Sequence, residues 1–195
     1  MLKVKIFTLY PDLFPGPLDI GIFKKAKENK IWNLKVINIR DYSKDNHGTV
    51  DDTPFGGGSG MLLRPDILAS ALDKNIKKGE KIIYLSPRGK KFDQNVARSL
   101  SKEKNLNLIC GHFEGVDQRL LETRNIEEYS LGDFVLSGGE PASFVIIDAI
   151  VRLLPGVLGN KDSVKEESFE NHLLEYPQYT KPREWEGKSP PEVLF

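Results

Sequence analysis

Three loops rich in glycine and proline contain residue types that could hold a flat ligand. They are 85–89 (L-S-P-R-G), 110–115 (C-G-H-F-E-G) and 130–140 (S-L-G-D-F-V-L-S-G-G-E). Each follows a strand-like segment, and ligands of α/β proteins bind just beyond the carboxyl ends of parallel strands. Glycines there let a ligand approach the backbone closely, and backbone amides can hydrogen-bond to the edge of a base. Any one loop alone is typical of a simple turn, but together they predict a pocket the size of adenine.

The glycine-rich segments do not match a known phosphate-binding loop. Residues 56–60 fail the G-x-G-x-x-G spacing, and Gly187-Lys188-Ser189 lacks the earlier glycine of a P-loop. The histidines, His47, His112 and His172, are too far apart in sequence for a familiar zinc site. The motifs therefore do not support nucleotide phosphate chemistry, and no metal site is predicted.

Two charged residues have unusual surroundings. Arg152 lies inside an apolar helical segment (I-I-D-A-I-V-R-L-L) and needs an anionic partner or a site to point into. Asp148, one turn earlier, could be that partner as an i,i+4 pair, so a structural and a functional role both stay open. Glu167 lies in a polar stretch and, on sequence alone, is typical of solvated charge.

These loops must be positioned by alternating strands and helices, which predicts an α/β fold with a mainly parallel sheet. Strands are expected at 3–9, 34–39, 81–85, 106–110, 128–131 and 134–136. Helices are expected at 12–28, 65–78, 93–100, 117–123 and 141–154. Residues 51–60 contain too much glycine for a regular element and predict a loop. The polar stretch after residue 159 is typical of a linker or an arm ordered by a partner.

Composition restricts the class of protein. The 195 residues carry 28 Lys and Arg against 28 Asp and Glu, with a basic surplus before residue 110 and an equal acidic surplus after it. Net zero charge argues against a nucleic-acid partner, but here it averages two unlike halves and decides little. One cysteine, Cys110, excludes an internal disulfide. No signal peptide or long apolar run is visible, so we expect a cytoplasmic protein without a membrane segment.

Six motifs follow one another along the chain in the order of one enzyme family. They are 7–14 (F-T-L-Y-P-D-L-F), 49–58 (T-V-D-D-T-P-F-G-G-G), 84–87 (Y-L-S-P), 111–119 (G-H-F-E-G-V-D-Q-R), 132–140 (G-D-F-V-L-S-G-G-E) and 155–159 (P-G-V-L-G). In these motifs the chain closely resembles the bacterial tRNA (guanine-N1)-methyltransferases, which are knotted SPOUT methyltransferases. The resemblance extends over essentially residues 1–195.

The resemblance implies a fold and an assembly. The sheet would end in a C-terminal deep trefoil knot, a topology that no general α/β argument predicts. Residues 1–159 would form the knotted domain, and 160–195 a polar linker arm and the start of a C-terminal tRNA-binding domain that is largely missing from this sequence. From that gap we expect weak tRNA binding with donor binding intact. The family acts as a homodimer whose active site combines both subunits.

The resemblance also implies a reaction, the methylation of guanosine N1 just 3′ of the tRNA anticodon. Its methyl donor, S-adenosylmethionine, would lie bent in the knot, and Mg²⁺ is suggested as an aid. Glu167 takes the place of the family's aspartate base, with E-E-S-F replacing E-D-S-F, and Arg152 matches an arginine that stabilises the guanine. The expected cofactor contacts are Tyr84, Leu85, Ser86, Pro87, Gly111, Glu114, Leu131, Gly132, Asp133, Phe134, Val135, Leu136, Gly138 and Gly139.

Two other functions remain open. A knotted methyltransferase acting on a ribose 2′-OH or a uridine would not need a base at Glu167, so Glu167→Gln would leave its activity unchanged. A non-catalytic or truncated RNA-binding domain with the same knot would fail to bind S-adenosylmethionine.

Overall fold

The computed structural model describes residues 1–158 and 176–195. The chain divides into two compact units, Met1–Gly159 and Asn160–Phe195. In the second unit the backbone N–H groups of Trp185 and Lys188 each donate to the other residue's carbonyl, at 3.0 Å, and close a turn. A short 3-10 helix, Glu192–Leu194, follows it.

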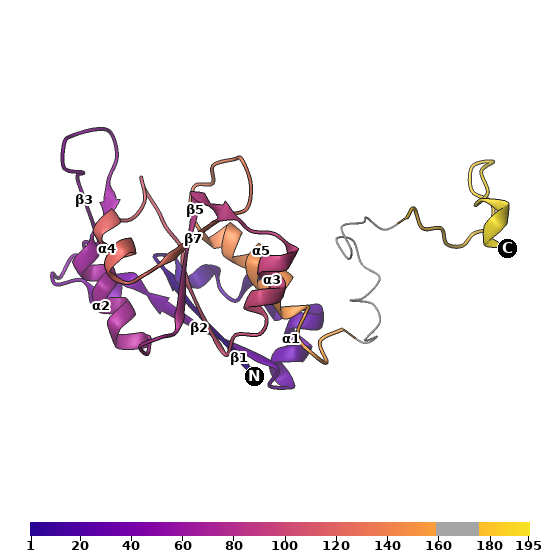
Figure 1. Cartoon of the computed structure of the whole chain (residues 1–195), viewed down its shortest axis with the longest axis horizontal. Coiled ribbons are helices and arrows are strands. Elements are labelled where there is room, and N and C mark those ends of the chain that lie inside the picture. The colour runs from indigo at the N-terminus through magenta and orange to yellow at the C-terminus, as the bar shows by residue number, and fades with distance from the viewer. Residues whose placement is uncertain (159–175) are drawn as a thin grey trace. The chain divides into compact units, whose positions relative to one another are not determined.

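A five-stranded sheet forms the centre of the first unit (Figure 1). Its strands are β1 (Leu2–Thr8), β2 (Trp32–Asn38), β5 (Lys81–Lys91), β6 (Asn105–Ile109) and β7 (Glu127–Ser130). The spatial order is β2-β1-β6-β5-β7, and all four strand pairings are parallel. This confirms the predicted α/β class with a mainly parallel sheet.

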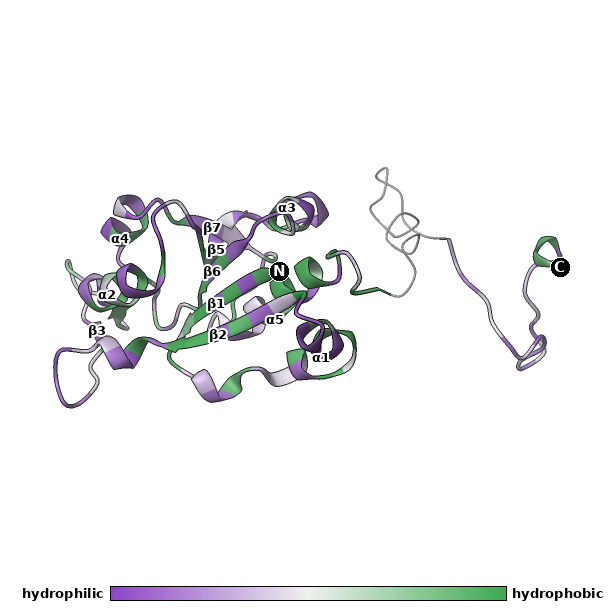
Figure 2. Ribbon diagram, turned by 90° about the horizontal axis from the view of Figure 1, so that it is seen from below, coloured by the Kyte–Doolittle hydropathy of each residue, from purple (hydrophilic) through white to green (hydrophobic). Residues whose placement is uncertain are grey.

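Helices cover both faces of the sheet, so the first unit has three layers (Figure 1). They are α1 (Gly21–Glu28), α2 (Pro65–Asn75), α3 (Gln94–Leu100), α4 (Gln118–Thr123) and α5 (Glu140–Val151). Alternate β1 residues point to opposite faces, as strand geometry requires. Val4 and Ile6 pack with α1, α3 and α5, whereas Phe7 packs with α2 and α4. Figure 2 shows mostly hydrophobic residues along β1, whereas α1 and α3 are largely hydrophilic.

The segment between β1 and β2 is less helical than predicted. Instead of one helix over 12–28, it forms two 3-10 turns, Pro11–Leu13 and Gly16–Asp19, before α1. Gly16 has a φ of +49°, which ends regular helix at that point. Another 3-10 turn, Ile39–Tyr42, follows β2.

The predicted loop at 51–60 is confirmed except at its base. β3 (Asp51–Asp52) and β4 (Leu62–Leu63) pair antiparallel and hold the glycine-rich segment between them as a hairpin loop.

β5 differs from the prediction, which ended the strand at residue 85. In the structure it continues to Lys91, and both Leu85 and Lys90 pair with Tyr129 of β7. Residues 86–89 therefore form a bulge within the strand. Pro87 fits there because a bulge does not require its missing N–H. A Cβ on Gly89 would lie 2.4 Å from the Tyr129 nitrogen, so only glycine fits so close to β7.

The strand predicted at 134–136 is wrong. Its residues form an exposed loop, with Val135 84% exposed, and the Phe134 N–H donates to the Gly132 carbonyl at 3.0 Å in a tight turn. The apolar residues suggested a strand, but the turn at Gly132 directs the backbone away from β7.

Among the described residues, no helix is long and apolar enough to cross a membrane.

Candidate active site

A cavity of about 300 Å³ lies beside the bulge of β5 and beyond the ends of β6 and β7, and all three predicted loops line it. The structure brings together every predicted cofactor contact except Asp133. These residues are Tyr84, Leu85, Ser86, Pro87, Gly111, Glu114, Leu131, Gly132, Phe134, Val135, Leu136, Gly138 and Gly139. That they contact a cofactor remains a prediction.

Two of the loops touch through their glycines. The Gly139 N–H donates to the Gly111 carbonyl at 2.9 Å. A Cβ on Gly139 would lie 2.6 Å from the Cα of Cys110, and one on Gly111 would lie 2.5 Å from the ring of Tyr84. Gly139 is required because the two loops pack directly on each other, and Gly111 because the Tyr84 ring packs against it. The cavity wall is therefore a tightly packed backbone surface.

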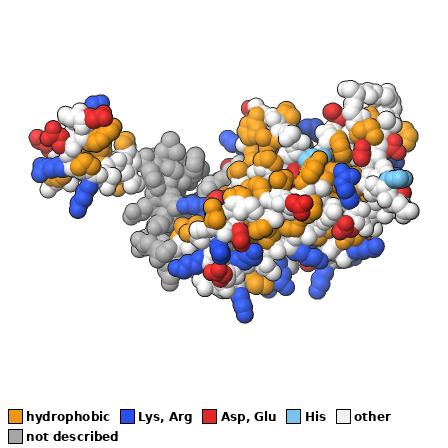
Figure 3. Space-filling view, turned by 180° about the vertical axis from the view of Figure 1, so that it is seen from behind, with side chains coloured by type: hydrophobic (Ala, Val, Ile, Leu, Met, Phe, Trp, Pro, Cys, Tyr) orange, Lys and Arg blue, Asp and Glu red, His pale blue; other side chains and the backbone are white. Residues whose placement is uncertain are grey.

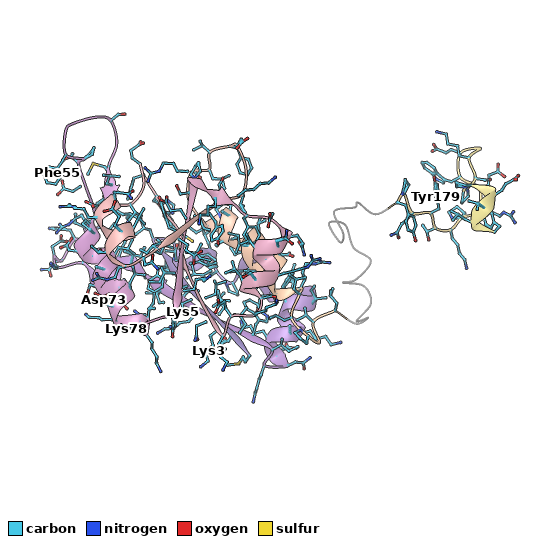
Figure 4. All side chains as sticks on the ribbon, viewed as in Figure 1. Lys3, Lys5, Phe55, Asp73, Lys78 and Tyr179 are labelled. Atoms are coloured by element: carbon cyan, nitrogen blue, oxygen red, sulfur yellow. The ribbon has the colours of Figure 1, made fainter. Side chains whose placement is uncertain are left out.

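The glycine-rich hairpin loop is joined to the second cavity loop. The Glu114 N–H donates to the Met61 carbonyl, and the Leu63 N–H to the Gly115 carbonyl, both at 2.9 Å. Figure 4 shows Phe55 on this hairpin loop, where its side chain is 95% exposed. The contacts join motif 111–119 to residues 61–63, which follow motif 49–58 at the end of the hairpin loop.

The cavity is also lined by residues that the sequence had not assigned to cofactor binding. They are Arg88, His112, Phe113, Gly115, Tyr129, Ser130, Ser137 and Ala142. Most belong to the three loops, so their position in those loops was the available signal. Tyr129 and Ala142 instead reach the cavity from β7 and α5, which only the packing of these elements reveals.

Burial keeps two side chains uncharged: Tyr84, which lines the cavity, and Cys110, which begins the second cavity loop. Burial raises the pKa of the Tyr84 hydroxyl, so it remains a neutral phenol. Burial, reinforced by the Glu140 carboxylate, raises the pKa of the Cys110 thiol. Cys110 is therefore a core residue and a poor nucleophile, as its place at the end of an apolar strand indicated.

The sequence of this chain is similar to those of known proteins. The sequence model of the family described as tRNA (Guanine-1)-methyltransferase TrmD matches residues 2–195. The chain belongs to this family.

Curated relatives agree with the TrmD assignment. A tRNA (guanine-N(1)-)-methyltransferase of Pelagibacter ubique is 69% identical over 195 residues, which are 100% of this chain and 86% of that protein. One from Wolbachia pipientis wMel is 51% identical over 197 residues, covering 99% and 84%. One from Rhodospirillum rubrum is 50% identical over 193 residues, covering 99% and 81%. Family members are enzymes, so the sequence interpretation as an enzyme is confirmed.

Of the two predicted catalytic residues of this TrmD-family chain, the structure describes one, Arg152. Glu167 lies outside the described residues. Arg152 directly follows α5 and is not among the cavity-lining residues in the described part of the chain. Partial burial raises the pKa of Asp148, and the Arg152 charge lowers it by less. This interaction supports the i,i+4 pairing and leaves a role of Arg152 toward guanine as a proposal.

The described ranges 1–158 and 176–195 contain no group of three or more His, Cys, Asp and Glu side chains arranged to hold a metal ion. A contribution of Mg²⁺ to the reaction stays a prediction.

Proposed function

We propose that this chain transfers a methyl group from S-adenosylmethionine to N1 of the guanosine just 3′ of the tRNA anticodon. The observation that carries the proposal is the TrmD family match over residues 2–195. It is supported by the one cavity in which three motif-bearing loops meet. The reaction would take place in the cytoplasm, where tRNA is modified.

The cavity suits the adenosine part of the donor. Its volume of about 300 Å³ is at the lower end for small-molecule sites, and its wall combines backbone with apolar side chains such as Leu85 and Leu131. In this proposal, backbone groups of the second and third loops would bind the edge of adenine. When bound, S-adenosylmethionine supplies a methyl group on a positively charged sulfonium. The nearby Glu114 carboxylate is compatible with that charge.

Guanine needs help from the protein because its N1 carries a proton and is a weak nucleophile at neutral pH. We assign Glu167 as the base that accepts this proton while N1 attacks the methyl carbon in line. The N1–carbon bond forms as the carbon–sulfur bond breaks, and the donor leaves as a neutral thioether. Arg152 would stabilise negative charge that develops toward the guanine O6, for which a guanidinium is well suited.

A homodimer completes this proposal, since Arg152 and the cavity of one chain lie apart. The first unit carries exposed apolar side chains of the kind that a second copy would cover. Ile20, Leu13 and Val145 are each at least 51% exposed. The segments that carry them are packed together, because the Phe14 ring centroid lies 4.8 Å from that of Phe144 on α5. Figure 3 shows hydrophobic side chains gathered over one face of the first unit.

The family resemblance also suggests how the two units are organised. We propose that Met1–Gly159 is a domain whose sheet ends in a deep trefoil knot, and that Asn160–Phe195 is a linker arm and the start of a tRNA-binding domain.

The deciding experiment is a methyl-transfer assay on unmodified tRNA transcripts that carry guanosine or another base at the target position. We expect N1-methylguanosine only with guanosine, identified by nucleoside mass spectrometry. Methylation that ignores this base, or product methylated on ribose, would refute the proposal. Failure to bind S-adenosylmethionine in calorimetry would instead favour a non-catalytic domain.

A further inference from the structure

Glu140 is a buried acidic residue that the proposed reaction does not use. It begins α5, at the end of the third cavity loop, and is 1% exposed. Its position in the first helical turn is favourable for negative charge. That position does not require burial, however, and a buried carboxylate is costly unless hydrogen bonds compensate for the lost water. Its partners should therefore indicate its role.

Two side chains from other elements bind the Glu140 carboxylate. The Thr8 hydroxyl, at the end of β1, donates to Oε1. The His112 Nε2 lies 2.7 Å from Oε2. When Glu140 is ionised it can only accept, and Nε2 then carries the proton of this bond. The Thr8 oxygen in turn accepts the Tyr10 N–H at 2.9 Å, and one carboxylate thus connects β1, the second cavity loop and α5.

His112 is the member of this network that lines the cavity. Its ring is held between the Tyr10 ring, 4.9 Å away edge-on, and the backbone of Gly138. A Cβ on Gly138 would lie 2.3 Å from the His112 ring and 2.8 Å from Glu140 Oε2, so glycine makes room for the bond between them. The His112–Glu140 bond thus fastens the second cavity loop to the third from behind the cavity wall.

We propose that Glu140 is a positioning residue for donor binding. Its carboxylate holds the His112 imidazole and, through it, residues 111–115 in the geometry that binds S-adenosylmethionine. The inference rests on the proposed function, because it assumes that the donor occupies this cavity. It adds a role for a side chain that does not itself line the cavity.

Two substitutions at His112 separate the hydrogen bond from simple packing. His112→Gln keeps an N–H donor for the carboxylate, whereas His112→Met fills similar space without one. We expect His112→Met to weaken S-adenosylmethionine binding about tenfold or more, the usual effect of losing a hydrogen bond to a charged group. We expect His112→Gln to restore most of the affinity. The KM for the donor should rise in His112→Met, while the KM for tRNA stays the same.

Glu140→Gln tests the other end of the bond, and Ser143→Ala is its matched control. Ser143 is buried one turn along α5 and donates to the Glu140 backbone carbonyl at 2.7 Å, so its loss disturbs the packing but not the carboxylate. We expect Glu140→Gln to weaken donor binding and Ser143→Ala to leave it unchanged. In the His112→Met background, Glu140→Gln should cause no further loss, because the two residues act as one unit.

Calorimetric donor affinity and melting temperature should be measured for every variant. Unchanged donor affinity in His112→Met would overturn the inference. So would equal losses in His112→Gln and His112→Met, or losses that follow melting temperature and include Ser143→Ala. If Glu140→Gln does not fold, the His112 pair alone decides. Wild-type protein that does not bind S-adenosylmethionine would refute the proposed function, whereas variants that bind as well as a functional wild type refute only this inference.

Discussion

Replacing Gly139 by alanine tests whether the cavity wall depends on direct backbone contact. The new Cβ would lie 2.6 Å from the Cα of Cys110, about 1 Å inside the distance at which two carbons pack favourably. The atoms that it meets, the Cα of Cys110 and the nitrogen of Gly111, belong to the backbone, so no side-chain rotation can relieve the contact. The two loops must separate, and the 2.9 Å bond from the Gly139 N–H to the Gly111 carbonyl would be lost.

The loss of folding stability follows from the overpacked contact and the lost hydrogen bond. Overpacking a core contact costs about 1–3 kcal/mol and losing one backbone hydrogen bond about 1 kcal/mol, so Gly139→Ala should destabilise the fold by about 2–4 kcal/mol. For a domain of this size, that corresponds to a melting temperature lower by roughly 5–15 °C. Differential scanning calorimetry measures this change directly.

Gly132→Ala is the matched control in the same loop. Its Cβ would meet the tip of the Phe134 ring at 2.9 Å, but that ring is 54% exposed and can rotate away. We expect a change within about 0.5 kcal/mol, as for ordinary surface substitutions. If Gly139→Ala melts at the same temperature as Gly132→Ala, the described contact between the two loops does not limit what fits there, and the reasoning is wrong.

Three further predictions concern ionisable side chains. Glu167→Gln should lower the methyl-transfer rate about 10²–10⁴-fold without changing donor affinity, whereas Glu167→Asp should retain activity. Rapid-quench assays would measure the rate and calorimetry the donor affinity. Unchanged turnover in Glu167→Gln would refute its role as the base. Hydrogen bonds from Lys44 and Arg64 lower the pKa of Asp66 to about 2, so its stabilisation is complete above the unfolded pKa of about 4 and is lost as pH falls toward 2. The stability difference between wild type and Asp66→Asn in urea should shrink over that range, and a constant difference would contradict this. Cys110 is fully buried with a raised pKa, so a thiol reagent at pH 8 should label it only in denaturant, and fast labelling of native protein would contradict its burial.

The sequence allowed much of the fold to be predicted because hydrophobic periodicity is a local signal. Alternating strands and helices predicted the parallel sheet, and the rule for carboxyl ends of strands predicted that three separate loops would meet. The failures occurred where local signals mislead. Pro87 and Gly89 suggested the end of a strand, but β5 absorbs them in a bulge because β7 pairs on both sides. Residues 134–136 have the composition of a strand but no neighbouring strand to pair with in the described sheet.

The site was only partly predictable. Glycines and prolines that interrupt regular structure indicated where a ligand could bind. They did not show that Asp133 lies off the cavity wall while its neighbours line it. The contact between His112 and Glu140 joins residues 28 positions apart. Neither residue has a periodicity or motif that reveals such a partner, and only the packing of β1, the second cavity loop and α5 brings the two together. The assignment of Glu167 and Arg152 depends on the family resemblance.

The bulge in β5 has a consequence for how a ligand meets this wall. Residues 86–89 leave the strand and return to the same partner residue, Tyr129, so the ladder fixes both ends of the segment. The entropy lost in ordering Ser86 and Pro87 is therefore lost when the domain folds, and binding does not incur it again. Residues 132–137, in the third cavity loop, have no such ladder. Amide exchange should be slow on both sides of the bulge before and after ligand is added, and any ligand-induced slowing should concentrate in residues 132–137.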